Sequence, residues 1–315
     1  MILINRMQKS RIAVLFYSQS GQLKQILESM TAVFSPASKV DFLEIKPVNV
    51  FPFPWTAFDF FDKMPECVQE DGCEVTLEGY DSSVNYDLII FGYQPWFLSP
   101  SMPTTGFLKT DVAKRLFSGK KVVTVIGARN MWLNAQEKVK SRLLSLDAIL
   151  VGNITFVDTT PNIISTITVI RWAFTGKKEA TRWLPQAGIQ PAEMSKTSEF
   201  GMILDGAIKS EDFNNLHKTL RSNGAVFINP QLILLEHTGI TQFRKWAASI
   251  KALGPPGDIR RKPLVKKFWQ TLFVGIFFLS PLNRLISKVK IAINAQKLKK
   301  DMEYFSSVDF HKNAI

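Results

Sequence analysis

A short polar loop near the start of the chain carries the residue types that bind a phosphate group. Two hydroxyls flank a glutamine, and Gly21 then leads directly into an amphipathic, helix-like pattern. A phosphate there would meet unpaired main-chain N–H groups, the positive end of the helix dipole and a backbone that glycine lets come close. We therefore prefer a phosphate site to the alternative, an ordinary serine N-cap. The residues assigned to the site are Ser18, Gln19, Ser20, Gly21, Gln22 and Leu23.

Two further loops with suitable chemistry follow later apolar runs. The first is framed by prolines and presents Trp96 as a flat wall for a planar ring, unless Trp96 simply packs beneath the loop. The second offers Arg129 as a cation for an acidic group, although a lone arginine is more often a surface charge. Ligands of open parallel sheets bind beyond the carboxyl ends of the strands, so the three loops together predict one ligand site. From these two loops we assign Gln94, Pro95, Trp96, Phe97, Gly127, Ala128, Arg129 and Asn130.

The elements that must position these loops alternate between strands and helices. Continuous apolar runs of strand length are typical of strands buried on both faces, and the helical patterns between them predict right-handed crossovers. We expect an α/β fold with a doubly wound, five-stranded parallel sheet. The expected strands are Arg11–Tyr17, Val40–Ile45, Leu88–Tyr93, Lys121–Ile126 and Ile149–Val157, with helices at 23–34, 104–116 and 135–146. The sheet region is expected to close with Gly224–Leu235 and a helix at Gln242–Leu253.

Two insertions interrupt this scaffold, at 47–83 and at 159–225. The first is rich in aromatic residues and could line a channel for an alkyl chain. A Gly-Pro-Pro-Gly breaker follows and divides the chain into a domain at 1–253 and a C-terminal helical segment at 254–315. The aromatic residues of the first insertion are Phe51, Phe53, Trp55, Phe58, Phe60 and Phe61.

Residues 1–157 resemble flavodoxins and NAD(P)H-dependent FMN reductases. The family's phosphate loop, Ser/Thr-x-Ser/Thr-Gly-x-Thr, is matched by Ser18, Ser20 and Gly21, whereas Leu23 stands where the last threonine is usual. Pro95-Trp96, with Met102-Pro103 and Phe107-Leu108 after it, resembles the second flavin loop and its following helix. The resemblance implies an FMN cofactor held by the three loops.

The longer pattern resembles one bacterial group, the DarA-type flavodoxin-like proteins known as dialkylresorcinol condensing enzymes. This resemblance implies an aromatase that oxidises a dialkyl cyclohexanedione, a lipophilic small molecule, to a dialkylresorcinol. Carbon–carbon condensation would then belong to a ketosynthase-type partner, and the sequence contains no paired Cys/His/His set of that kind. No catalytic residue is assigned beyond the candidate Arg129. The alternatives are a general NAD(P)H-dependent quinone or FMN reductase and a non-enzymatic, membrane-associated scaffold with a degenerate flavodoxin fold.

The positive charge of the chain is concentrated near its C-terminus. Between residues 251 and 300, twelve Lys and Arg against Asp258 give +11 of the chain's +12. These charges flank an apolar run at 268–282, which is short for a membrane span but suits an interfacial helix at an anionic membrane. The alternative is a buried helix with a solvated basic tail. Nucleic-acid binding is disfavoured because no stacking aromatics interleave with the basic residues.

Cysteine usage and the N-terminus favour a cytoplasmic protein, and the basic C-terminal segment favours peripheral docking on the inner membrane. Cys67 and Cys73 are expected to be reduced thiols in a loop, with a redox pair as the alternative. The three histidines are scattered, so we expect no metal site. No signal peptide is recognised in the first residues, and Met7 is a possible start.

Overall fold

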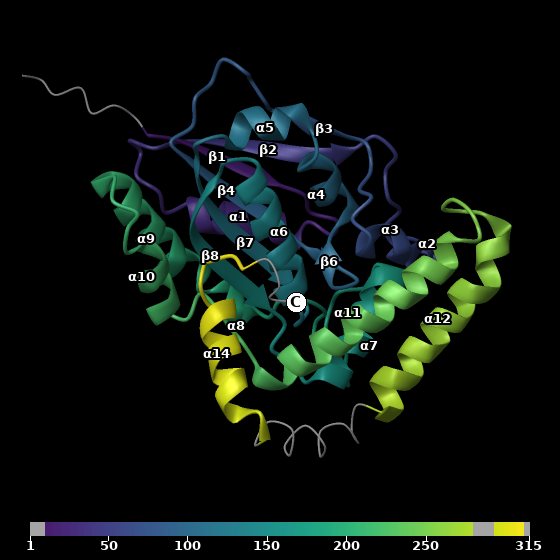
Figure 1. Ribbon diagram of the computed structural model, residues 1–315. Helices are drawn as coiled ribbons and strands as arrows, with labels where there is room; N and C mark the ends of the chain where they lie inside the picture. Colours follow the sequence, from purple (N-terminus) through teal and green to yellow (C-terminus); the bar gives the residue numbers. More distant parts are fainter. Residues whose placement is uncertain (1–9, 280–292, 312–315) are drawn as a thin grey trace, which may run out of the picture.

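The core of the protein is a twisted six-stranded sheet with helices on both faces (Figure 1). This computed structural model describes residues 10–279 and 293–311. The strands lie in the order β3-β2-β1-β4-β7-β8, and all neighbours are parallel except β3, which is antiparallel to β2. The strands are β1 (Arg11–Phe16), β2 (Lys39–Pro47), β3 (Val75–Glu78), β4 (Leu88–Tyr93), β5 (Pro95–Trp96), β6 (Ser99–Pro100), β7 (Lys121–Ala128) and β8 (Ile149–Val157).

The five parallel strands follow the flavodoxin order, in which the second strand lies at the edge and the chain then crosses to the other side of the first. The predicted fold class is therefore confirmed, and the sheet has six strands instead of the predicted five. The sixth strand, β3, is short and lies within the predicted insertion 47–83, where Ile45 pairs with Leu77. It was missed because four residues of mixed polarity carry little strand signal.

The helices form three groups. The helices α1, α9 and α10 cover one face of the sheet, α4, α5, α6 and α14 cover the other, and α2, α3, α11 and α12 pack into a third cluster. Their bounds are α1 (Gln22–Thr31), α2 (Ala57–Asp62), α3 (Met64–Val68), α4 (Met102–Phe107), α5 (Asp111–Phe117), α6 (Leu133–Ser145), α7 (Asn162–Thr175), α8 (Pro191–Met194), α9 (Thr197–Ser210), α10 (Leu216–Ser222), α11 (Pro230–Lys251) and α14 (Ala295–Phe305). The short η1 (Ile259–Arg261) precedes α12 (Lys262–Val274), which continues into the π-helical η2 (Gly275–Leu279).

Two helix predictions were wrong in their bounds. The expected helix at 104–116 is two helices, because Thr110 is extended and caps α5 by accepting a hydrogen bond from the Ala113 N–H at 3.1 Å. The expected helix Gln242–Leu253 is longer, since α11 runs from Pro230, after an Asn229 cap, to Lys251, and Gly224–Leu235 contains no strand.

The thiols also lie elsewhere than expected. Both are free, but Cys67 lies in the helix α3 and is buried, so only Cys73 is in a loop. Burial raises the pKa of the Cys73 thiol to about 11 and that of Cys67 further, so both stay protonated at neutral pH.

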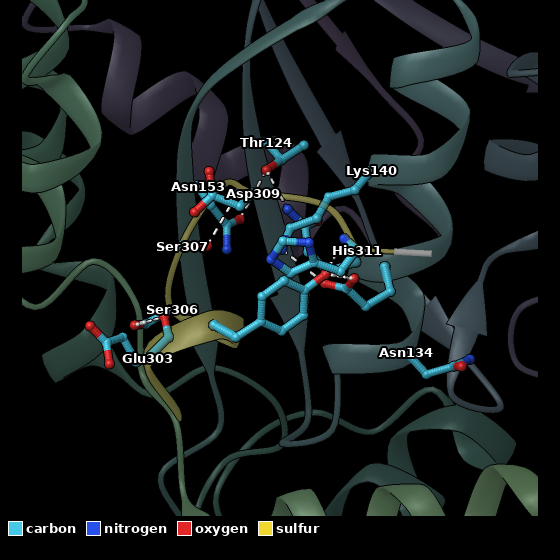
Figure 2. A network of polar contacts seen from close by, with 12 residues as sticks. Thr124, Asn134, Lys140, Asn153, Glu303, Ser306, Ser307, Asp309 and His311 are labelled. Carbon is cyan, nitrogen blue, oxygen red and sulfur yellow. Dashed lines mark hydrogen bonds and ion pairs between the residues drawn. The ribbon is translucent and has the colours of Figure 1, made fainter. Parts of the chain in front are cut away.

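The C-terminal segment is fastened to the rest of the protein at both described ends. Arg261 is fully buried and pairs with Asp62 at 2.9 Å and Glu66 at 3.1 Å, which ties η1 and α12 to α2 and α3. At the other end, the Tyr304 hydroxyl of α14 donates to the Glu137 carboxylate of α6 at 2.5 Å, and the buried Lys140 of α6 lies over the Tyr304 ring (Figure 2).

Candidate functional site

The loop after β1 has the backbone conformation that a phosphate cradle needs. Gly21 adopts a left-handed φ of 80° at the N-cap of α1. A Cβ built there would meet nothing within 4 Å, so the space before the helix is open. The first-turn N–H groups of a helix have no partner within it and are available to an anion. Ser18 and Ser20 are half-buried beside them, and the Ser18 hydroxyl accepts a long bond of 3.4 Å from the Lys24 N–H.

Glutamine side chains tie this loop to its neighbours. The Gln19 N–H donates to Gln94 Oε1 at 2.9 Å, which joins the loops after β1 and β4. The Gln19 side chain donates to the carbonyls of Phe51 and Pro52 at 3.4 and 3.2 Å and accepts from the Tyr17 hydroxyl. The predicted loop residues therefore meet the aromatic insertion here.

Gln22 and Leu23 offer a phosphate only their main-chain groups. Gln22 is buried and exchanges two hydrogen bonds of 3.0 Å with the backbone of Ile189. Leu23 is buried in the core under Gly127, where a Cβ would come within 3.4 Å of the Leu23 side chain. Gly127 thus permits close packing of α1 on the end of β7.

Trp96 lies in an aromatic cluster. Its ring makes edge-on contacts with Tyr17, Phe51 and Trp55 at centroid distances of 5.9, 5.3 and 5.7 Å. It remains half-buried in the two-residue strand β5, and Phe97 begins the left-handed turn that leads to β6. The ring packs against Tyr17 and the insertion, and its role as a flavin wall stays a prediction.

Arg129, at the carboxyl end of β7, is not an ordinary surface charge. Its Nη1 donates to Asn162 Oδ1 at 2.7 Å and to Thr166 Oγ1 at 2.9 Å, both on α7. Asn130 donates to the same Asn162 oxygen at 2.8 Å. Burial lowers the pKa of Arg129 to about 10, a shift that the negative charge of Asp158 opposes, so the guanidinium remains a cation at neutral pH.

The loops that follow β4 and β7 open onto a large, mainly apolar cavity of about 510 Å³. Helices α2, α7, α11 and α12 supply most of its walls, and Figure 1 shows the last three grouped to one side of the sheet. From the predicted site it includes Pro95, Phe97, Arg129 and Asn130. The phosphate loop does not line it, so the predicted residues divide between a cradle and a neighbouring cavity.

Sequence reasoning missed most of the cavity walls. The signal for Asn162 and Thr166 was present, since they are polar residues at the start of an apolar helix whose polar side chains turn inward. The other walls come from segments far apart in the sequence that only the fold brings together. These wall residues include Phe60, Phe61, Phe174, Leu235, Phe243, Trp246, Leu272, Phe273 and Ile276.

The residues present fit a flavin mononucleotide in part. The open cradle at Gly21, with the first-turn N–H groups of α1 and two hydroxyls, suits a monophosphate without a lysine. Leu23 cannot give the usual threonine hydroxyl, so binding would depend on main-chain donors. Arg129 and Asn130, one strand away, offer polar contacts for a ring system.

The chain has a flavodoxin-like fold. No family model matches the sequence, and neither does any curated protein. Among solved structures it is similar to a flavoprotein from Lactobacillus acidophilus in complex with FMN, with 22% identity and a TM-score of 0.36 over 47% of this chain and 93% of that one. Flavodoxin 1 from Bacillus cereus is 12% identical with a TM-score of 0.34, over 61% of this chain and 95% of its own. These values are low, and the fold assignment rests on the strand order of the chain itself.

Proposed function

We propose that this protein is an FMN-dependent oxidoreductase that acts as an aromatase, oxidising a dialkyl cyclohexanedione to a dialkylresorcinol. The observation that carries the proposal is the apolar cavity at the ends of β4 and β7, next to the loop that suits a phosphate. A general quinone reductase would need only a planar site. A cavity walled by aromatic and aliphatic side chains suits a ring that bears alkyl chains.

The proposed reaction needs no covalent bond between the substrate and the protein. Aromatisation of the dione removes a hydride and a proton, and FMN, when bound, would supply the hydride acceptor. Arg129, beside a ring oxygen, would stabilise the negative charge that builds there as the neighbouring C–H proton passes to water. The apolar walls would orient the ring and its alkyl chains for the hydride transfer.

The proposal includes a ketosynthase-type partner that makes the dione, and docking at an anionic membrane surface. None of the described helices is long and apolar enough to cross a bilayer. The apolar side chains Val265 and Phe268 of α12 pack into the protein, as the alternative of a buried helix expects. Lys266 and Lys267 are exposed on its other side, whereas residues 280–292, with the rest of the apolar run and its basic flank, lie outside the described residues.

The test is flavin binding by the purified protein. We expect an absorbance spectrum of bound flavin, or its appearance when FMN is added. Protein that carries no flavin and gains none would overturn the proposal and favour the scaffold alternative. Rapid NAD(P)H oxidation with simple quinones, together with no reduction of the bound flavin by the dione, would favour the reductase alternative.

A further inference from the structure

The cavity has one unusual electrostatic property. Among the described residues that line it, Arg129 is the one with a charged side chain. The other polar lining groups are neutral amides and hydroxyls, such as Asn162, Thr166, Thr238 and Gln242. A half-buried cation on an otherwise apolar wall is costly unless an anion joins it.

The hydrogen bonds of Arg129 leave one edge of its guanidinium open. All of its bonds to described residues come from Nη1, which donates to Asn162 and Thr166 at 2.7 and 2.9 Å. Neither Nε nor Nη2 has a partner among the described residues. Asp158 acts on Arg129 electrostatically, but its carboxylate accepts hydrogen bonds from the Ser165 hydroxyl at 2.6 Å and the Thr160 N–H at 2.9 Å.

The Nε and Nη2 edge of an arginine presents two parallel donors. This fork matches two oxygens of a planar, delocalised anion. Carboxylates and the enolates of acidic diketones both have that shape. Because Arg129 lines the cavity, an anion bound to its Nε and Nη2 from the cavity side would have its remaining atoms in the apolar space.

The rest of the cavity suits an alkyl chain. Phe174 on α7, Phe243 and Trp246 on α11, and Leu272 and Phe273 on α12 enclose it. Burying a methylene group contributes about 0.8 kcal/mol, so a chain of several carbons would add substantially to the affinity.

We propose that the cavity binds an anionic amphiphile, with its planar pair of oxygens on Arg129 and its alkyl chain between α7, α11 and α12. The inference rests on the proposed function for its choice of the enolate of an alkyl cyclohexanedione as the natural head group. The binding itself needs no flavin.

The experiment compares dodecanoate with dodecanol on the flavin-free protein at neutral pH, by calorimetry or tryptophan fluorescence. We expect dodecanoate to bind about tenfold to a hundredfold more tightly, as hydrogen bonds to charged groups predict. An alkyl cyclohexanedione is the third probe, and it distinguishes an enolate ligand from a fatty acid. Equal affinities of the wild-type protein for dodecanoate and dodecanol would overturn the proposal.

Variants test whether Arg129 causes the preference for dodecanoate over dodecanol. Arg129→Met should remove the preference for dodecanoate and leave the affinity for dodecanol unchanged. Arg182 is an exposed arginine outside the cavity, so Arg182→Met should change neither the preference nor the affinity for dodecanol. If Arg129→Met does not fold, Ala173→Trp fills the cavity and should abolish dodecanoate binding, with the exposed Ala248→Trp as its control. A preference that survives Arg129→Met, or binding that survives Ala173→Trp, contradicts the inference.

The two claims fail separately. Protein that prefers dodecanoate but binds no FMN would retain this inference and lose the proposed function. Protein that binds FMN but does not distinguish the two amphiphiles would lose the inference alone.

Discussion

A substitution at Gly21 tests the predicted phosphate site. Its left-handed φ of 80° and open surroundings mean that a β-branched side chain would strain the turn and cover the first N–H groups of α1. We expect Gly21→Val to abolish measurable FMN binding. The binding is measured by the quenching of flavin fluorescence. Gly119→Val is the matched control, because Gly119 also has a positive φ, 68°, and nothing within 4 Å of a built Cβ. Loss of binding in both variants, or in neither, would contradict the assignment.

Glu236 is a buried acid that sequence reasoning did not single out. It lies on α11 and accepts a hydrogen bond of 2.7 Å from the Asn134 N–H at the start of α6, and burial raises its pKa from 4.5 to about 7. The folded state therefore holds a proton that the unfolded state releases between these pH values, so folding is favoured at low pH and loses this contribution as pH rises towards 7.

Glu236→Gln removes that titration. At about 1.4 kcal/mol per pKa unit, the wild-type free energy of unfolding should fall by about 3 kcal/mol relative to the variant between pH 4.5 and 7. Urea unfolding of both proteins across this range measures the difference. Parallel pH profiles would show that Glu236 titrates normally.

At the scale of elements, the attachment of α12 depends on one buried arginine. Arg261 is fully buried between Asp62 and Glu66, and removing it leaves two buried carboxylates without a cation. We expect Arg261→Met to destabilise the protein by about 3–5 kcal/mol in chemical denaturation. Its neighbour Arg260 makes an exposed pair with Asp258, so Arg260→Met should leave the stability almost unchanged. Equal effects would mean that α12 is held by its apolar contacts alone.

The elements themselves were largely predictable from the sequence. Parallel strands buried on both faces are continuous apolar runs, and the predicted strands Leu88–Tyr93 and Ile149–Val157 have these bounds in the structure. The cavity was not predictable, since residues such as Phe60, Thr166 and Leu272 meet only through tertiary packing. The phosphate site was predicted from a local feature, a polar loop that leads into a helix, and it stays a prediction.

At the scale of the whole molecule, the structure narrows the basic surface that could meet a membrane. Lys251, Arg260 and Arg261 are paired with carboxylates, so they offer little to an external anion. Exposed lysines remain on α12 and α14. They are Lys262, Lys266, Lys267, Lys297, Lys299 and Lys300.

The membrane proposal makes a quantitative prediction. At about 1 kcal/mol per lysine near anionic lipid, replacing the three exposed lysines of α12 by glutamine should weaken vesicle binding by about a hundredfold. Co-sedimentation with vesicles containing phosphatidylserine measures this, and neutral vesicles are the control. Binding that is insensitive both to these replacements and to salt would argue against electrostatic docking.

The central claim is that a flavin and a lipophilic dione react within this one fold. It is tested most directly by adding an alkyl cyclohexanedione to the FMN-loaded protein without oxygen and recording the absorbance spectrum. We expect bleaching of the flavin band together with formation of the resorcinol in equal amount. A spectrum that stays oxidised, from a protein that holds FMN and binds the dione, would contradict it.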